Sequence, residues 1–125
     1  EDDIYVASNA AGLLADVADE YPEAVATEID PFVQLLDHDD AQLRYNAVAV
    51  LTRVADVNPE AVEPLIPKFI DLLDDELVDT RFNVCWALRY LDATAAVERL
   101  TEVAETDPSE KVQSVALHAI DGITE

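Results

Sequence analysis

Three aromatic side chains and two arginines recur at helical spacing along the middle of the chain. They are Tyr45, Arg53, Phe82, Trp86 and Arg89. Aromatic rings supply large apolar contact areas, and tryptophan, tyrosine and arginine are the residues that most often anchor protein interfaces. Arginine also pairs with carboxylates through two parallel hydrogen bonds. These residue types therefore predict a surface that binds a protein or peptide partner.

Residues that could catalyse a reaction or hold a metal ion are sparse. The two histidines, His38 and His118, are far apart in the sequence and do not form His-Glu pairs. The acidic runs at 37–40 and 74–76 lack the spacing and the glycine of a calcium-binding loop. A glycine-rich phosphate loop is also missing. We therefore expect no metal, no cofactor and no enzymatic activity.

Cys85 is the single cysteine, so an internal disulfide is excluded. It lies among apolar residues, which predicts a buried, inert thiol. Arg81 and Arg89 stand four residues on either side, and a nearby positive charge activates thiols. A reactive thiol therefore remains the alternative.

The net charge of −21, from 28 acidic and 7 basic residues, excludes several classes of partner. Phosphate binding needs a basic stripe, and no run of this sequence supplies one. The same charge argues against an anionic membrane surface, and no apolar run is long enough to cross a bilayer. We expect a cytoplasmic protein that binds neither nucleic acid nor membrane.

Half of the residues are hydrophobic, so the chain has material for a core despite its charge. In a compact domain so many carboxylates repel one another at low salt. At about 1 M salt the screening length falls to about 3 Å, and most of this repulsion disappears. The composition thus resembles proteins of salt-accumulating halophiles. The alternative is an acidic domain that binds a basic partner in ordinary salt.

The first part of the sequence is written again 37 residues later. Asn9 returns as Asn46 and Asn83, and the string at 22–25 returns at 59–62. Repetition at a fixed spacing of a few tens of residues indicates a stacked repeat architecture. The last unit is shorter, with a spacing of 32.

The elements that must carry these residues are helices. Apolar residues recur at i, i+4, i+7, i+8 and i+11, as on one buried helical face. Prolines at 31, 64 and 67 fall inside the expected helices and predict bends, with a split near Pro64 as one option. The seven expected helices cover about 4–20, 22–36, 41–57, 59–73, 77–91, 93–105 and 107–123.

The segments 43–51, 80–88 and, more weakly, 112–120 resemble the second helix of HEAT repeats, and 58–62 resembles adaptin-like repeats. The resemblance implies an all-α, right-handed α-solenoid of about three and a half helical hairpins, with residues 1–125 forming one domain. HEAT and armadillo arrays mostly serve as protein scaffolds. The sequence has no methionine, so we expect a piece of a longer or processed protein.

In such a stack the second helices line the concave surface, which implies an exposed aromatic cluster of Tyr45, Phe82 and Trp86. Asn46 and Asn83 are similar to the asparagine ladder with which armadillo arrays hold a peptide backbone. A hydrogen bond that fixes repeat stacking is the other interpretation of these asparagines. For Tyr45 and Phe82 the alternative is packing between repeats, and for Trp86 it is the covering of a gap.

Two further arginines, Arg44 and Arg81, occupy the position that in this family often pairs with an acid of a neighbouring repeat. We expect Asp40 and Asp79 as their partners. Gln113 replaces arginine in the last unit. Besides the scaffold, the resemblance leaves open a HEAT-like enzyme or enzyme accessory of bilin-lyase or repair type, or a structural segment covered by its parent chain.

Overall fold

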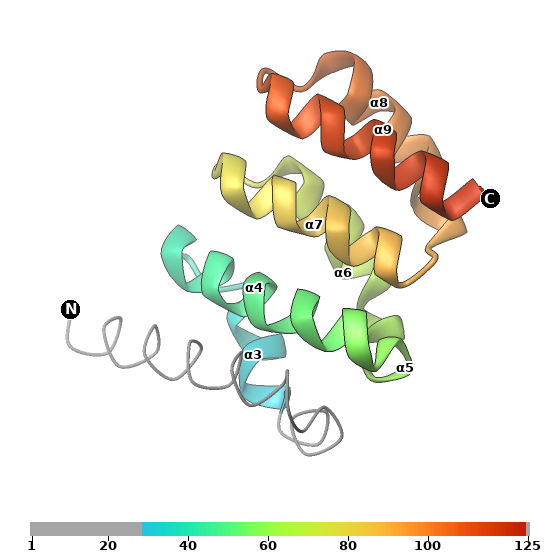
Figure 1. Ribbon diagram of the computed structural model, residues 1–125. Helices are drawn as coiled ribbons and strands as arrows, with labels where there is room; N and C mark the ends of the chain where they lie inside the picture. Colours follow the sequence, from blue (N-terminus) through green and yellow to red (C-terminus); the bar gives the residue numbers. More distant parts are fainter. Residues whose placement is uncertain (1–28, 125) are drawn as a thin grey trace.

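The computed structural model describes residues 29–124, which form three helical hairpins stacked side by side (Figure 1). The first hairpin pairs α3 (Asp30–Leu35) with α4 (Ala41–Val57). In the second, α5 (Pro59–Val62), η1 (Glu63–Leu65), α6 (Ile66–Asp71) and η2 (Leu72–Asp74) pack on α7 (Val78–Tyr90). The third consists of η3 (Thr94–Ala96), α8 (Val97–Thr106) and α9 (Glu110–Thr124). The expected helix at 4–20 and the start of the one at 22–36 lie outside the described residues.

The second helices α4, α7 and α9 lie next to one another, and the first helices form a second layer behind them (Figure 1). The described part of the chain contains helices and no strand. This arrangement confirms the predicted α-solenoid.

The apolar stripes of the second helices form the core between the layers. In α4 the stripe from Leu43 to Val54 is buried, and in α7 Val84 and Leu88 are fully buried. The first helices contribute Phe69 and Leu100, which are also fully buried. Because each hairpin covers the apolar face of the next, no hairpin buries its stripe alone.

Prolines divide the first layer into short helical pieces. The prolines that were expected to bend helices each lie in the first turn of such a piece, where a missing N–H costs no hydrogen bond. They are Pro31 in α3, Pro64 in η1 and Pro67 in α6. The expected helix at 59–73 is thus broken at η1, as the option near Pro64 predicted. The expected helix at 93–105 also differs, because it begins with the 3-10 turn η3 before α8.

Candidate functional site

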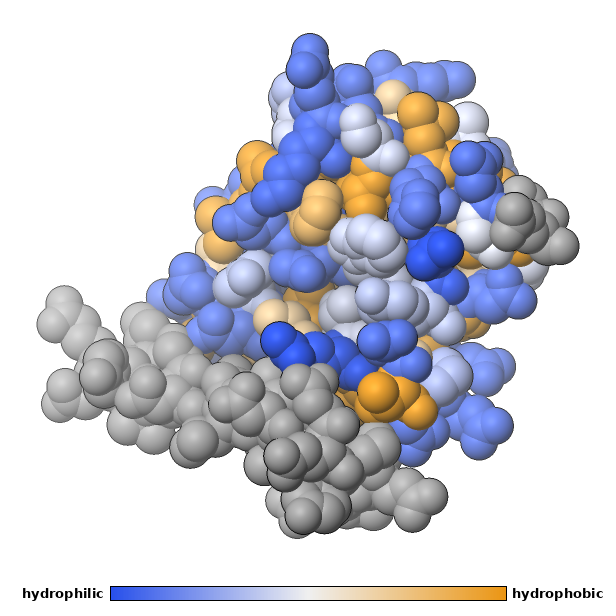
Figure 2. Space-filling view, viewed as in Figure 1, coloured by the Kyte–Doolittle hydropathy of each residue, from blue (hydrophilic) through white to orange (hydrophobic). Residues whose placement is uncertain are grey.

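All seven predicted binding residues lie on α4 and α7, which face the viewer in Figure 1. Figure 2 shows the same side, where hydrophobic side chains are interspersed among hydrophilic ones. A surface of this kind offers both apolar contact and polar pairing.

Trp86 is the centre of a cluster that joins α7 to α9. Its indole stacks on Tyr90 with ring centroids 5.8 Å apart, and its centroid lies 5.2 Å from that of His118 in a T-shaped arrangement. The guanidinium carbon of Arg89 lies 5.6 Å from the indole centroid. Trp86, Tyr90 and Arg89 are half-buried, whereas His118 is exposed. The cluster therefore packs against the core, and the rest of its surface is exposed to solvent.

Arg89 reaches this position because α9 carries a glycine opposite it. A Cβ atom on Gly122 would lie 2.4 Å from the Nε of Arg89, closer than real Cβ atoms approach. That Nε is buried and has no hydrogen-bond partner among the described residues. The arginine is thus held by packing and by the indole face beside it.

Phe82 is covered by a lysine of the same chain. The ammonium nitrogen of Lys111 lies 4.4 Å from the ring centroid of Phe82 and 3.1 Å from the Oδ1 of Asp79. The ring itself is half-buried and packs against the core. Phe82 therefore already has a cation on its open face.

Tyr45 lies in a different environment, a groove of about 500 Å³ between the N-terminal parts of α4 and α7. The groove is lined by Gln42, Tyr45, Glu76, Leu77, Val78 and Asp79. The ring contacts of the described residues join Trp86 to Tyr90 and His118 rather than to Tyr45 or Phe82. The three predicted aromatic residues thus occupy three neighbouring environments on one side of the stack.

The asparagines hydrogen-bond within their own helices. The Oδ1 of Asn46 accepts from the side chain of Gln42 at 3.2 Å, and the Nδ2 of Asn83 donates to the carbonyl of Asp79 at 3.1 Å. Arg53 is exposed near the C-terminal end of α4. These contacts place the three polar binding candidates on the surface of the second helices.

Arg44 and Arg81 link successive hairpins, but the expected partners are wrong. The Nε of Arg44 donates to Asp75 at 2.7 Å, and the Nε of Arg81 donates to Asp107 at 2.9 Å. Asp40 instead caps α4 by accepting from backbone N–H groups of its first turn. The partner is the acid in the turn before the following second helix, because an arginine side chain reaches across to the next hairpin.

A side chain of each second helix also contacts a backbone carbonyl in the turn that precedes its own helix. Arg44 donates to the carbonyl of His38 at 2.7 Å, Arg81 to that of Asp75 at 2.8 Å, and Gln113 to that of Asp107 at 2.6 Å. Gln113 therefore keeps the contact with the backbone of its own unit. Unlike Arg44 and Arg81, it has no charge with which to pair with an acid of a following hairpin. Arg44 and Arg81 thus link successive hairpins.

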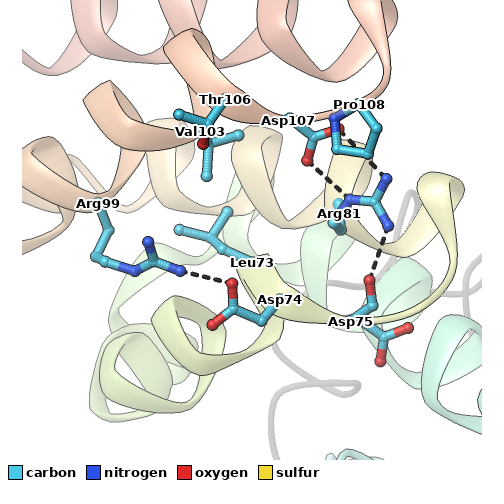
Figure 3. A pocket seen from close by; sticks show the side chains of 9 residues that line it. All are labelled: Leu73, Asp74, Asp75, Arg81, Arg99, Val103, Thr106, Asp107 and Pro108. Carbon is cyan, nitrogen blue, oxygen red and sulfur yellow. Dashed lines mark hydrogen bonds and ion pairs between the residues drawn. The ribbon is translucent and has the colours of Figure 1, made fainter.

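A cleft of about 230 Å³ lies between the second and third hairpins and is lined in part by the buried Arg81–Asp107 pair. Figure 3 shows the side chains that line it. Across the cleft, Arg99 donates to Asp74 at 2.8 Å. Both arginines of the cleft thus pair with aspartates across the hairpin boundary, which stabilises the stack.

The thiol of Cys85 is buried, as the apolar sequence around it predicted. Burial, with a smaller contribution from Asp107, raises the pKa of Cys85 to about 12. Arg81 opposes this shift only weakly, so the alternative of an activated thiol is wrong. Within residues 29–124, no group of three histidine, cysteine or acidic side chains is placed to hold a metal ion.

Sequence reasoning assigned no binding role to three residues of this surface: Tyr90, Lys111 and His118. Tyr90 follows Trp86 by four residues, so the two rings share a helix face. The 32-residue spacing of the last unit relates His118 to Trp86 and Lys111 to Asp79. That spacing was the available signal for the residues on α9.

Comparison with known proteins agrees with this geometry. A protein-family model described as HEAT repeats matches residues 29–121. The structure is similar to a designed armadillo repeat protein, with a TM-score of 0.72 and 25% sequence identity over 94% of this chain. The chain spans 58% of that protein's length. No curated protein matches the sequence. None of the helices between residues 29 and 124 combines the length and the apolar character needed to cross a bilayer.

Proposed function

Because the chain belongs to the HEAT repeat family, whose members commonly bind proteins or peptides, we propose that it is a non-catalytic scaffold with its binding surface on the second helices. A partner segment or helix docks across α4 and α7 and reaches α9 at His118. The proposed surface comprises Tyr45, Asn46, Arg53, Phe82, Asn83, Trp86 and Arg89, to which we add Tyr90 and His118.

The environment of Trp86 is the observation that carries this proposal. An indole that is half-buried, stacked on Tyr90 and open on one side gains from being covered further, because its remaining apolar area leaves water. Arg89 lies beside it and supplies a cation for a partner carboxylate. Aromatic and arginine side chains that are already fixed lose little entropy on binding.

We also propose that the scaffold is adapted to high salt. In the described structure Lys68 pairs with Asp37, Arg99 with Asp74 and Glu102, and the remaining acidic residues outnumber the cations. High salt screens the repulsion among these carboxylates.

The enzyme alternative needs a pocket in which polar groups converge on a substrate. In the cleft of Figure 3, Arg81 pairs with Asp107 and Arg99 with Asp74, while the carboxylate of Asp75 pairs with Arg44. These charged groups are bound to one another rather than converging on a substrate, so no observation favours that alternative.

The test is affinity capture from a lysate at high salt, followed by mass spectrometry and by binding measurements on the purified partner. We expect Trp86→Ala to weaken partner binding at least about tenfold, as for an interface anchor, and addition of Tyr45→Ala to abolish it. Glu98→Ala with Glu105→Ala on α8 is the matched control, because both residues are exposed on the first-helix side. Full binding by the Trp86 variant would contradict the proposal.

A further inference from the structure

The groove beside Tyr45 has a filled counterpart one repeat further along the array. Between α7 and α9, Lys111 places its ammonium 4.4 Å from the Phe82 centroid and 3.1 Å from Asp79. The 37-residue spacing relates Tyr45 to Phe82 and Gln42 to Asp79. The 32-residue spacing relates Asp79 to Lys111. In the Tyr45 groove an acid thus stands where the next repeat has its lysine.

Because of this exchange, no residue that lines the groove places a cation on the Tyr45 ring. Of the six lining residues none is basic, and two, Glu76 and Asp79, are acidic. A carboxylate at position 79 cannot replace the lysine over the ring, because the face of an aromatic ring carries negative charge density. Gln42 takes the place that Asp79 has in the lysine site, and the carboxylates of the groove are those of Glu76 and Asp79. The groove therefore offers an aromatic ring and two acids and lacks a lysine.

The walls of the groove suit the rest of a lysine side chain. Leu77 and Val78 supply apolar surface, and Val78 is 40% exposed. A lysine buries its methylene stem on such surface while its ammonium stays at the polar end. Glu76 and Asp79 are held in place by Arg44 at 3.0 Å and by Lys111 at 3.1 Å. Each of these contacts uses one carboxylate oxygen.

We propose that this groove binds a lysine side chain from a basic partner segment, with the ammonium over the Tyr45 ring and the stem against Leu77 and Val78. The inference rests on the proposed function, because it names the chemistry of a partner on the same surface. Charge complementarity supports this occupant, because the two charged residues that line the groove, Glu76 and Asp79, are both acidic. At high salt the long-range attraction is screened, while the contact between ring and ammonium acts at short range.

The experiment uses three five-residue probes, acetyl-Gly-Leu-Xaa-Leu-Gly-amide, in which Xaa is lysine, norleucine or glutamate. Each probe is titrated into the isotope-labelled full chain at low and at molar salt while backbone amide resonances are followed. We expect the lysine probe to give saturable shifts at 42–45 and 76–79. We expect no such shifts from the norleucine and glutamate probes. Equal binding of the norleucine or glutamate probe would overturn the inference.

Variants distinguish the contribution of the Tyr45 ring to binding from that of its hydroxyl group and from that of the overall charge. Tyr45→Phe keeps the aromatic face and should bind the lysine probe like the parent chain, whereas Tyr45→Leu should bind it about fivefold more weakly. Asp79→Asn should also weaken binding, and Asp56→Asn, at the far end of α4, is the control of equal charge. Parent-like binding by Tyr45→Leu overturns the proposal.

Failure of this inference can be told from failure of the proposed function. If the lysine probe does not bind but Trp86→Ala still weakens partner binding, the scaffold proposal stands and the lysine site is wrong. If the lysine probe binds while Trp86→Ala binds partner fully, the lysine site stands and the Trp86 surface is wrong.

Discussion

Arg81 lies where the second and third hairpins meet, and its guanidinium group bonds to both. It donates to the carbonyl of Asp75 at 2.8 Å and to the carboxylate of Asp107 at 2.9 Å. Both side chains of the pair are at least nine-tenths buried. Removing one partner of a buried pair is costly because the remaining charge is left without compensation.

We therefore expect Asp107→Asn to lower the free energy of unfolding by about 2–4 kcal/mol. Asp74→Asn removes the same charge from the exposed pair with Arg99, so it should have a much smaller effect. Urea unfolding followed by circular dichroism measures both changes. Equal losses in the two variants would show that the buried pair has no special weight.

Gly122 gives a second test of a single contact, because its effect should depend on Arg89. Alanine in a helix is more stable than glycine by about 0.5–1 kcal/mol. In an Arg89→Ala background, Gly122→Ala should therefore raise the free energy of unfolding. In the parent background the new Cβ would lie 2.4 Å from the arginine Nε, so the gain should vanish or reverse.

A double-mutant cycle with thermal unfolding measures this coupling. The Trp86 emission spectrum should also change in the Gly122→Ala variant, because Arg89 must move from beside the indole. The same stability gain in both backgrounds would mean that Arg89 moves aside at no cost.

The start of helix α4 is fixed by an N-cap residue in the preceding turn. Asp40 accepts from the N–H groups of Gln42 at 2.9 Å and Leu43 at 3.1 Å. We expect Asp40→Ala to lower the free energy of unfolding by about 1 kcal/mol, the usual contribution of an N-cap. Asp39→Ala changes the same charge one residue earlier and is the control. Chemical denaturation should separate the two variants.

The burial of Cys85 in α7 predicts how the stability of the fold depends on pH. Burial raises the pKa of Cys85 to about 12, whereas an unfolded cysteine titrates near pH 8.5. Deprotonation above about pH 8.5 therefore favours the unfolded state, so this thiol lowers stability as pH rises from there towards 12. Below pH 8.5 it makes no such contribution.

At pH 8.5 iodoacetamide should therefore react with Cys85 only when the helices around it separate. We expect the reaction rate to increase with urea in parallel with unfolding measured by circular dichroism. Fast alkylation of the native chain would indicate that the helices separate locally without global unfolding.

The sequence predicted the helices wherever one residue type controls the local structure. Pro64 breaks the first layer, and the apolar stripe of α4 is buried as its periodicity requires. Contacts between hairpins were less predictable. Asp75 and Asp107 were missed as arginine partners because the direction in which a side chain crosses to the next hairpin depends on how the hairpins stack.

For the candidate site, the same limit applies to α9. Trp86 was found from its own helix, but its contact with His118 and the covering of Phe82 by Lys111 require the third hairpin in place. Gly122 matters only because Arg89 lies against it. Side chains that act across hairpins are thus the part that local patterns leave undetermined.

The charge of the entire chain determines how its stability should respond to salt. With 28 acidic and 7 basic residues, repulsion acts over about 10 Å at 0.1 M salt and only about 3 Å at 1 M. The buried Arg81–Asp107 pair is screened less than exposed charges, so salt should weaken the repulsion more than it weakens the links between hairpins.

We therefore expect the melting temperature to rise steeply between low and molar KCl, as measured by calorimetry at neutral pH. Tetramethylammonium chloride at equal ionic strength is the control, because it screens charge without binding carboxylates as a small cation would. A similar rise in both salts indicates screening. A melting temperature that does not change with salt would contradict adaptation to high salt and favour a basic partner as the reason for the acidic surface.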